Sequence, residues 1–376
     1  MTRFNLAASI VIAGAALAAT HVAQAGQVVV GQVAPMSGLE ANQGRAYAAG
    51  MQLLFTSVNK AGGVNGHTFA LVRKDDGGRP EETLSGTKQI LSEDKPLVLA
   101  GYFGNRNISD LMSSGLLEKE KIALVGYRAA EIRPETPLLY NVRASLRDEI
   151  NKLTEHLATI GITRLGLFYE DGPGAAALIA VAEEAAKKAN ATIITKASYP
   201  AGTARVSPAI EIFTKVSPQA ILMVSSGAAA AGFIEQYRSA GGGAQLFAHS
   251  GADIEQLSKR LAEEQMQGVA IAQVTPSPYK ISSKLAKDFT DAVAKNDKLE
   301  VPVSYAMMEG YIAAKVIVEA VRRQGARPTR EGTVAALDAM DSYNLGGYVV
   351  GFKPGMRSGS KFVELSIISG AGKIRQ

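Results

Sequence analysis

The sequence predicts an α/β protein with two lobes, each built on a parallel central sheet. Short apolar or β-branched segments alternate with longer segments in which apolar residues recur every three or four positions. This alternation breaks near residue 140 and then begins again. Removing the first 25 of the 376 residues leaves 351, which is more than one core usually supports. Two βα series joined by several crossings of the chain account for both the pattern and the length.

The first 25 residues have the pattern of a secretory signal peptide. Arg3 supplies a positive charge, residues 4–19 are almost free of charge, and residues 23–25 form a small-x-small cleavage site. An uncleaved membrane helix is the alternative, but the apolar stretch is short for a span of about 20 residues, and His21 lies just beyond it. We therefore expect cleavage after Ala25 and a mature chain that works outside the cytoplasm.

The predicted elements alternate along the chain. Each predicted strand is apolar or β-branched and is bounded by Gly, Pro or charge. The strands span residues 28–33, 69–74, 97–100, 122–125, 165–169, 192–198, 220–224, 246–249 and 269–274. Each predicted helix has one apolar face, which in the first helix includes Ala46, Leu53 and Val58. The helices span residues 44–60, 80–92, 109–118, 147–160, 175–189, 207–216, 228–240 and 282–294. Such βαβ repeats favour parallel sheets with helices on both faces.

Two extended segments separate the lobes. Residues 138–143 end the first series, and residues 274–278 follow the second. Two long helices come next, followed by strands in the tail; these elements span residues 305–324, 329–340, 348–352 and 361–368. We expect lobe 1 to comprise residues 26–143 and 275–342, and lobe 2 to comprise residues 144–274 and 343–376. Open parallel sheets bind ligands at the carboxyl ends of their strands, so two facing sheets predict a cleft that a hinge can close.

The composition argues against several other classes of protein. The absence of cysteine excludes disulfides, thiolate metal sites and cysteine nucleophiles. The net charge is +5, but Lys and Arg alternate with Asp and Glu, which indicates solvated helix faces and no nucleic-acid surface. Beyond the signal, His67, His156 and His249 lack metal-ligand spacing, and GxSxG and phosphate-loop motifs are missing. We expect a protein that is not an enzyme and needs no cofactor, with a secreted α/β hydrolase as the less favoured alternative.

A family resemblance runs through the whole mature chain in order. The segments that carry it are APMSG at 34–38, NKAGGVNG at 59–66, KDD at 74–76, GYFG at 101–104, NVRAS at 141–145, SYP at 198–200 and EGYIAAK at 309–315. The sequence resembles the type I periplasmic solute-binding proteins, in the branch that includes leucine/isoleucine/valine-binding and amide-binding proteins. The resemblance implies two Rossmann-like lobes joined by a three-crossing hinge. It also implies a periplasmic monomer that delivers a small solute to the permease and ATPase subunits of an inner-membrane ABC importer. A sensor that presents its ligand to a membrane receptor shares the fold and remains an alternative.

The resemblance also implies where lobe 1 contacts the ligand, namely in the loops after its first, third and fourth strands. In the first loop, Gln43 faces the ligand unless the loop only forms a tight turn. The loop after the third strand contains Phe103 and Asn105, and relatives usually have Ser or Thr where Asn105 and Asn107 stand. Those hydroxyls and the backbone N–H groups of the following helix hold a carboxylate, and Asn retains a donor for this role. For Asn107, capping that helix is the alternative.

Two arginines at these loops favour an anionic solute. Arg106 lies in the third loop, and Arg128 lies between Tyr127 and Ala129 in the fourth. The guanidinium group offers a planar fork that matches a carboxylate or a phosphate. The alternative for each arginine is that it points to solvent or pairs with Asp76 or Glu131.

The second lobe departs from the branched-chain amino-acid receptors. Gly251 stands where those receptors carry an acid for the ligand's ammonium group, and Gly227 stands near an aromatic position. Asp171 or Asp253 would then serve as the ammonium partner, although a helix cap is the alternative for Asp171. Otherwise the ligand has no ammonium group, and the small residues leave room for a bulkier aromatic or aliphatic acid. His249, at a strand end, either contacts the ligand or makes a structural hydrogen bond.

Overall fold

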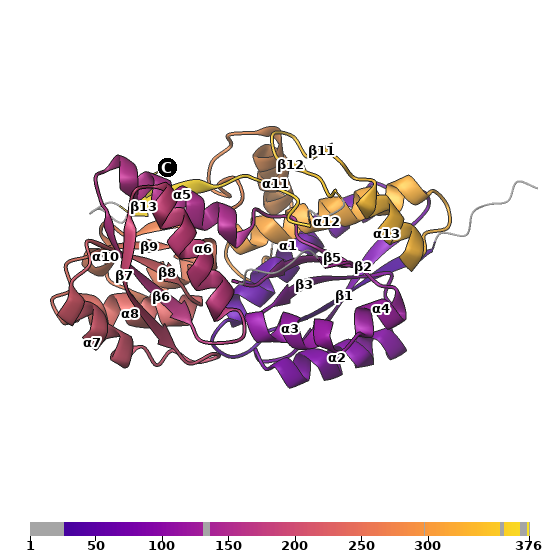
Figure 1. Ribbon diagram of the computed structural model, residues 1–376. Coiled ribbons are helices and arrows are strands. Elements are labelled where there is room, and N and C mark those ends of the chain that lie inside the picture. The colour runs from indigo at the N-terminus through magenta and orange to yellow at the C-terminus, as the bar shows by residue number, and fades with distance from the viewer. Residues whose placement is uncertain (1–25, 131–135, 297, 354–356, 369–373, 376) are drawn as a thin grey trace, which may run out of the picture.

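The computed structural model describes residues 26–130, 136–296, 298–353, 357–368 and 374–375. The predicted signal peptide and Glu131 lie outside the described residues. Two α/β lobes lie side by side, with α1–α4 and α12–α13 in one and α5–α10 in the other (Figure 1). The restart of the βα series near residue 140 therefore corresponds to the passage of the chain from one lobe to the other.

Lobe 1 is a five-stranded parallel sheet with helices on both faces. Its order is β2-β1-β3-β4-β5, formed by β1 (Gln27–Ala34), β2 (Thr68–Asp75), β3 (Val98–Phe103), β4 (Leu124–Arg128) and β5 (Leu139–Tyr140). One face packs against α1 (Ala41–Lys60), α11 (Lys284–Ala294), α12 (Tyr305–Gln324) and α13 (Arg330–Asp338). The other face packs against α2 (Pro80–Glu93), α3 (Asn105–Ser113) and α4 (Leu116–Glu120).

Lobe 2 has seven strands in the order β14-β13-β10-β9-β8-β6-β7. Five are parallel: β6 (Arg164–Glu170), β7 (Thr192–Tyr199), β8 (Ala220–Val224), β9 (Gln245–Ala248) and β10 (Ala270–Gln273). The tail adds two antiparallel strands at one edge, β13 (Glu364–Ile368) and β14 (Ile374–Arg375). One face is covered by α5 (Leu146–Thr159) and α6 (Ala175–Lys188). The other is covered by α7 (Ser207–Val216), α8 (Gly227–Ser239), α9 (Ile254–Arg260) and α10 (Glu263–Met266).

The start of α3 differs from its prediction in a way that matters for the site. The sequence pattern predicts a helix over 109–118, but α3 begins at Asn105 and a separate helix, α4, follows Gly115. Gly104 precedes α3 with φ 101°, a conformation that favours glycine and lets the chain turn sharply out of β3. Asn105, Arg106 and Asn107 therefore form the first helical turn and are not loop residues.

The crossings between the lobes are tied together by Tyr348. Its hydroxyl lies 2.9 Å from the carbonyl oxygens of both Val142 and Val274, which belong to the two other crossing segments. Tyr348 lies within the small hairpin of β11 (Tyr343–Asn344) and β12 (Val349–Val350), directly before β12. The apolar side chains of Leu345, Tyr348, Val350 and Phe352 pack in the core of lobe 1. This packing favours a lobe boundary between Phe352 and β13, later than the predicted boundary at residue 343.

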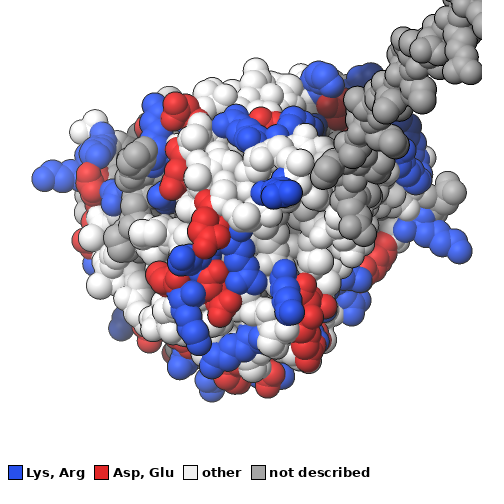
Figure 2. Space-filling view, turned by 90° about the vertical axis from the view of Figure 1, so that its right-hand side faces the viewer, with Lys and Arg blue, Asp and Glu red and all other residues white. Residues whose placement is uncertain are grey.

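The surface agrees with the scattered charges of the sequence. On the face shown in Figure 2, Lys and Arg side chains are interspersed with Asp and Glu side chains. Examples in lobe 1 are the exposed pairs Lys287–Asp291 and Lys121–Glu331. Within the described residues, no helix is both long enough and apolar enough to cross a membrane.

Candidate ligand-binding site

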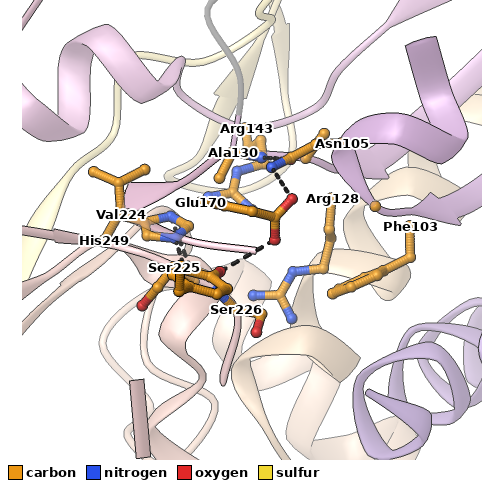
Figure 3. Close-up of a pocket in the computed structure, with 14 residues that line it drawn as sticks. Phe103, Asn105, Arg128, Ala130, Arg143, Glu170, Val224, Ser225, Ser226 and His249 are labelled. Carbon is orange, nitrogen blue, oxygen red and sulfur yellow. Dashed lines mark hydrogen bonds between the residues drawn. The ribbon is translucent and has the colours of Figure 1, made fainter. Parts of the chain in front are cut away.

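A cavity of about 60 Å³ lies between the lobes, at the carboxyl ends of the strands of both sheets. We call it the inner cavity. It is lined by Phe103, Gly104, Asn105, Arg128, Ala129, Ala130, Arg143, Glu170, Tyr199, Val224, Ser225, Ser226, His249 and Gly251. Phe103, Asn105 and Arg128 enter from one side, and Val224, Ser225 and His249 enter from the other (Figure 3). A ligand in this space would therefore touch both lobes.

A second hollow adjoins the inner cavity, and its lining includes the exposed side chains of Leu39 and Arg106. We call it the outer hollow; its volume is about 210 Å³. It shares Phe103, Gly104, Asn105, Glu170 and Ser226 with the inner cavity. The two spaces together make one interlobe cleft, and their shared residues stand at its centre.

Asn105 and Glu170 join the lobes across this centre. The Asn105 Nδ2 atom donates to Glu170 Oε1 at 3.2 Å, and Asn105 Oδ1 accepts from the Ala130 backbone N–H at 2.6 Å. Glu170 lies at the end of β6, and its other oxygen accepts from the Tyr199 hydroxyl at 3.1 Å. Burial raises the pKa of Glu170, while the hydrogen bonds from Tyr199 and Asn105 act in the opposite direction. Glu170 lies between Asn105 of one lobe and Ser225 of the other (Figure 3).

Two arginines of the cavity wall pair with two buried glutamates that lie behind the wall. Arg143 binds Glu149 at 2.7 Å and Glu309 at 3.5 Å. Arg128 lies 3.5 Å from the same Glu309 and donates to the Ser250 carbonyl oxygen at 3.2 Å. Both arginines line the inner cavity, but their charge is matched by these two carboxylates.

Gln43 and Glu40 connect lobe 1 to the start of α8. Gln43 is fully buried, and its Oε1 atom accepts from Arg128 at 2.5 Å. Its amide nitrogen donates to Glu40 at 2.6 Å. The other Glu40 oxygen accepts from the Ala228 backbone N–H at 3.1 Å, across the cleft. Burial raises the pKa of Glu40 to about 7. The structure thus places Gln43 behind Arg128, outside the lining of the inner cavity.

His249 and Gly251 form a compact turn on the lobe 2 side. The His249 Nδ1 atom accepts from the Gly251 N–H at 3.1 Å, and Nε2 lies 3.0 Å from the Ser225 carbonyl oxygen. Because Nδ1 accepts a hydrogen bond, the ring is neutral and its Nε2–H donates to Ser225; burial also lowers the pKa of His249, which favours this form. A Cβ atom at Gly251 would lie 2.2 Å from the His249 ring. A side chain at residue 251 would therefore collide with the His249 ring, so an acid cannot occupy this position unless His249 moves.

The remaining predicted site residues lie outside the inner cavity. Arg106 borders the outer hollow, but its side chain is 69% exposed. It pairs at 3.5 Å with Asp110, which is also exposed, and not with Asp76. Asp171 is exposed. Asp253 caps α9 through the Gln256 N–H at 3.0 Å. Neither of these acids is placed to meet a ligand in the inner cavity.

Three further residues have structural positions. Tyr127 packs on the core beneath α3, and its carbonyl oxygen accepts from Asn141 at 3.1 Å. Gly227 begins α8 and is buried. Asn107 donates to Thr83 of α2 at 2.7 Å, and Gly104 is the N-cap of α3, so the alternative that Asn107 caps this helix is wrong.

Sequence reasoning missed five polar residues of the cavity wall, namely Arg143, Glu170, Tyr199, Ser225 and Ser226. Arg143 lies in the segment between β5 and α5, and the other four stand at or just after the carboxyl ends of β6, β7 and β8. The rule that open parallel sheets bind ligands at these ends was enough to select the three loops. Which side chain of each loop lines the cavity depends on the tertiary structure.

Residues 27–361 match the family model described as periplasmic binding protein. The chain belongs to this family. A substrate-binding periplasmic protein from Ralstonia solanacearum is 35% identical to this periplasmic binding protein, with 92% of this chain and 99% of that chain covered at a TM-score of 0.87. The Leu/Ile/Val-binding protein homolog 8 of Brucella abortus is 24% identical over 372 residues, which cover 94% of this chain and 90% of the relative.

A more distant structure confirms the fold class. A branched chain amino acid ABC transporter from Thermus thermophilus with bound valine is 16% identical, with 93% of this chain and 94% of that chain covered at a TM-score of 0.78. These likenesses confirm the predicted two-lobed type I fold and the membership of the chain in the periplasmic binding protein family, and the chain is similar to Leu/Ile/Val-binding relatives. Membership in the family implies a periplasmic location and a solute-binding role, which fits the expectation that the protein is not an enzyme.

Proposed function

We propose that this periplasmic binding protein closes its two lobes on a small carboxylate-bearing solute and delivers it to an ABC importer in the inner membrane. The observation that carries the proposal is the inner cavity, because polar groups of both lobes, including Asn105, Arg128 and Glu170, line it together. A ligand that contacts both walls stabilises the closed arrangement more than the open one, and this difference drives closure.

The lobe 1 wall suits a carboxylate. The nine-residue helix α3 begins at Asn105, so its first backbone N–H groups and the positive end of its dipole lie beside the cleft. Arg128 adds a buried guanidinium on the same side. These donors support an acidic group on the ligand without specifying the rest of it.

Binding is tested first with the purified mature protein. A thermal-shift screen of amino acids, aliphatic acids and aromatic acids should reveal ligands that raise the melting temperature, since any compound that binds only the folded state stabilises it. Isothermal titration with each hit should give saturable binding without formation of a product. A product would contradict the receptor function and favour the hydrolase alternative.

Delivery to a transporter is tested in cells. Deleting the gene should abolish uptake of the radiolabelled ligand, and restoring the gene should recover it. In this proposal the signal peptide is cleaved, and the mature protein is a periplasmic monomer that passes its ligand to the permease and ATPase subunits of the importer. Normal uptake in the deletion strain, together with a lost response to the ligand, would favour a sensor.

A further inference from the structure

The outer hollow extends the cleft from the central strands of the two sheets toward one edge of each sheet. β2 is an edge strand of the lobe 1 sheet, and β7 is an edge strand of the lobe 2 sheet. The segments that follow these two strands line the outer hollow, namely Gly77, Gly78 and Pro80 in lobe 1 and Ala201, Gly202 and Thr203 in lobe 2. The inner cavity is lined mainly from the ends of β3, β4, β6, β8 and β9. A ligand in the inner cavity can therefore continue toward this edge and still lie between the lobes.

The two spaces differ in size. Their volumes are about 60 Å³ for the inner cavity and about 210 Å³ for the outer hollow. Because one water needs about 10–15 Å³, the inner cavity has room for about four to six groups of that size. This room is enough for a carboxylate and about one to three further carbon atoms. The rest of a longer solute has to lie in the outer hollow, which shares Phe103 and Asn105 with the inner cavity.

Every polar side chain that lines the outer hollow already has a partner in the protein. Asn105 donates to Glu170, and Glu40 accepts from Gln43 and from the Ala228 N–H. The remaining partners are Asp110 for Arg106, Thr83 for Asn107, the Pro200 carbonyl oxygen for Thr203 and the Ala229 N–H for Ser226. A second charged group of a ligand would therefore have to displace one of these contacts.

The surface that remains for a ligand in the outer hollow is apolar. It is formed by Leu39, Pro80, Phe103 and Ala201, together with the backbone of the lining glycines. The Leu39 carbonyl oxygen accepts from Gln256 of lobe 2 at 3.2 Å, yet the Leu39 residue is 58% exposed. The closed arrangement thus holds Leu39 at the cleft and leaves its side chain in water. An apolar chain that covered Leu39 would remove both apolar surfaces from water, which stabilises the complex.

We propose that the outer hollow binds an apolar tail of the solute, so that the receptor takes monocarboxylic acids whose chain is longer than about four carbons. This inference rests on the proposed function and specifies the ligand class for the same cleft. The carboxylate lies in the inner cavity beside Arg128 and the start of α3, and the tail lies between Leu39 of lobe 1 and Ala201 of lobe 2. The tail also favours closure, because it contacts both lobes.

The first test is a series of straight-chain acids from butanoate to octanoate, measured by isothermal titration with the wild-type protein. The affinity should rise about two- to fourfold with each added methylene group, since each group that enters the outer hollow leaves water. Octanoate should therefore bind at least about tenfold more tightly than butanoate. Equal affinities along the series, or binding of amino acids alone, would overturn the inference and leave the proposed function intact. Binding of no amino acid, aliphatic acid or aromatic acid would contradict the proposed function as well.

A second comparison tests the apolar character of the tail. Octanedioate has a second carboxylate in place of the terminal methyl group of octanoate. It should bind at least about tenfold more weakly than octanoate, because a charge placed in the outer hollow loses water and lies near the carboxylates of Glu40 and Glu170. Equal or tighter binding of octanedioate would show that the outer hollow accepts an anionic group, for example through Arg106, and would overturn the inference.

Two variants locate the tail. Leu39→Ser removes the exposed apolar side chain and should weaken octanoate binding about three- to tenfold, while butanoate binding stays within about twofold. The matched control is Ile281→Ser, because Ile281 is 65% exposed and lines neither space; it should leave both affinities within about twofold. Circular dichroism and the melting temperature of the unliganded variants establish that both are folded. Undiminished octanoate binding by folded Leu39→Ser, or an equal loss for both acids, would overturn the inference.

Discussion

The Asn105 amide nitrogen lies 3.2 Å from a carboxylate oxygen of Glu170, and this hydrogen bond spans the cleft between the lobes. Asn105 belongs to the first turn of α3 in lobe 1, and Glu170 ends β6 in lobe 2. The bond requires the closed arrangement, because separating the sheets would separate the two side chains. The same two residues line both the inner cavity and the outer hollow, so closure and ligand contact occur at one place.

Asn105→Ala should weaken ligand binding. The change removes the bond to Glu170 and leaves the Ala130 N–H without its acceptor. A loss of about 1–3 kcal/mol is expected, which is roughly 5- to 150-fold in affinity. Isothermal titration measures the affinity, and small-angle X-ray scattering should show a larger fraction of open molecules. Unchanged affinity and unchanged scattering would remove Asn105 from the closing mechanism.

Arg106→Ala should have little effect on binding. The side chain is 69% exposed, and its ion pair with Asp110 is a surface pair of the kind that contributes about 0–1 kcal/mol. The affinity is expected to change by less than about threefold. The variant also serves as the control for Asn105→Ala, because it alters the next residue of the same helical turn. A tenfold loss would show instead that Arg106 reaches into the cleft and contacts the ligand.

Glu40 should make closure depend on pH. Its pKa is raised to about 7 when the lobes cover it, against an ordinary value of 4.5, mainly because of burial, with nearby Asp253 acting in the same direction. The closed state therefore binds a proton more readily than an open state with Glu40 exposed. The contribution of Glu40 to the stability of the closed state is complete below pH 4.5, and it is lost as the pH rises through about 7.

The measurement compares dissociation constants of the wild type and Glu40→Gln between pH 5 and 8. The wild-type affinity should fall, relative to the variant, by no more than about tenfold per pH unit, since a single proton is involved. Taking the ratio of the two proteins isolates Glu40, because Glu170 and His249 titrate in both. Parallel pH profiles would contradict this role.

Glu149→Gln should destabilise the fold. Glu149 is 1% exposed, binds Arg143 at 2.7 Å and accepts the Ser250 N–H at 2.7 Å. Breaking a buried pair leaves an arginine poorly compensated, at a cost of about 3–5 kcal/mol in the free energy of unfolding. Denaturant unfolding followed by circular dichroism measures the loss. The matched control is Arg147→Ala, which breaks the exposed pair with Glu184 and should cost no more than about 1 kcal/mol.

Much of the architecture was predictable because it depends on local patterns. Apolar periodicity predicts α7 at 207–216, β8 at 220–224 and α12 at 305–324, and the structure has these bounds. The short helices α9 and α10 and the edge strand β14 were not predicted. Elements of so few residues contain too little periodicity to be distinguished from a loop.

The sequence by itself determined the two βα series, the family and the cleft at the carboxyl ends of the strands. Tertiary structure decided which side chain at each strand end faces that cleft. Successive side chains of a strand point in opposite directions, so extending β6 to Glu170 separates Glu170 in the cavity from Asp171 in solvent. The start of α3 at Asn105 likewise directs Asn105 across the cleft and Arg106 outward. A shift of one residue thus changes the chemistry of the site, and only packing between distant segments fixes it.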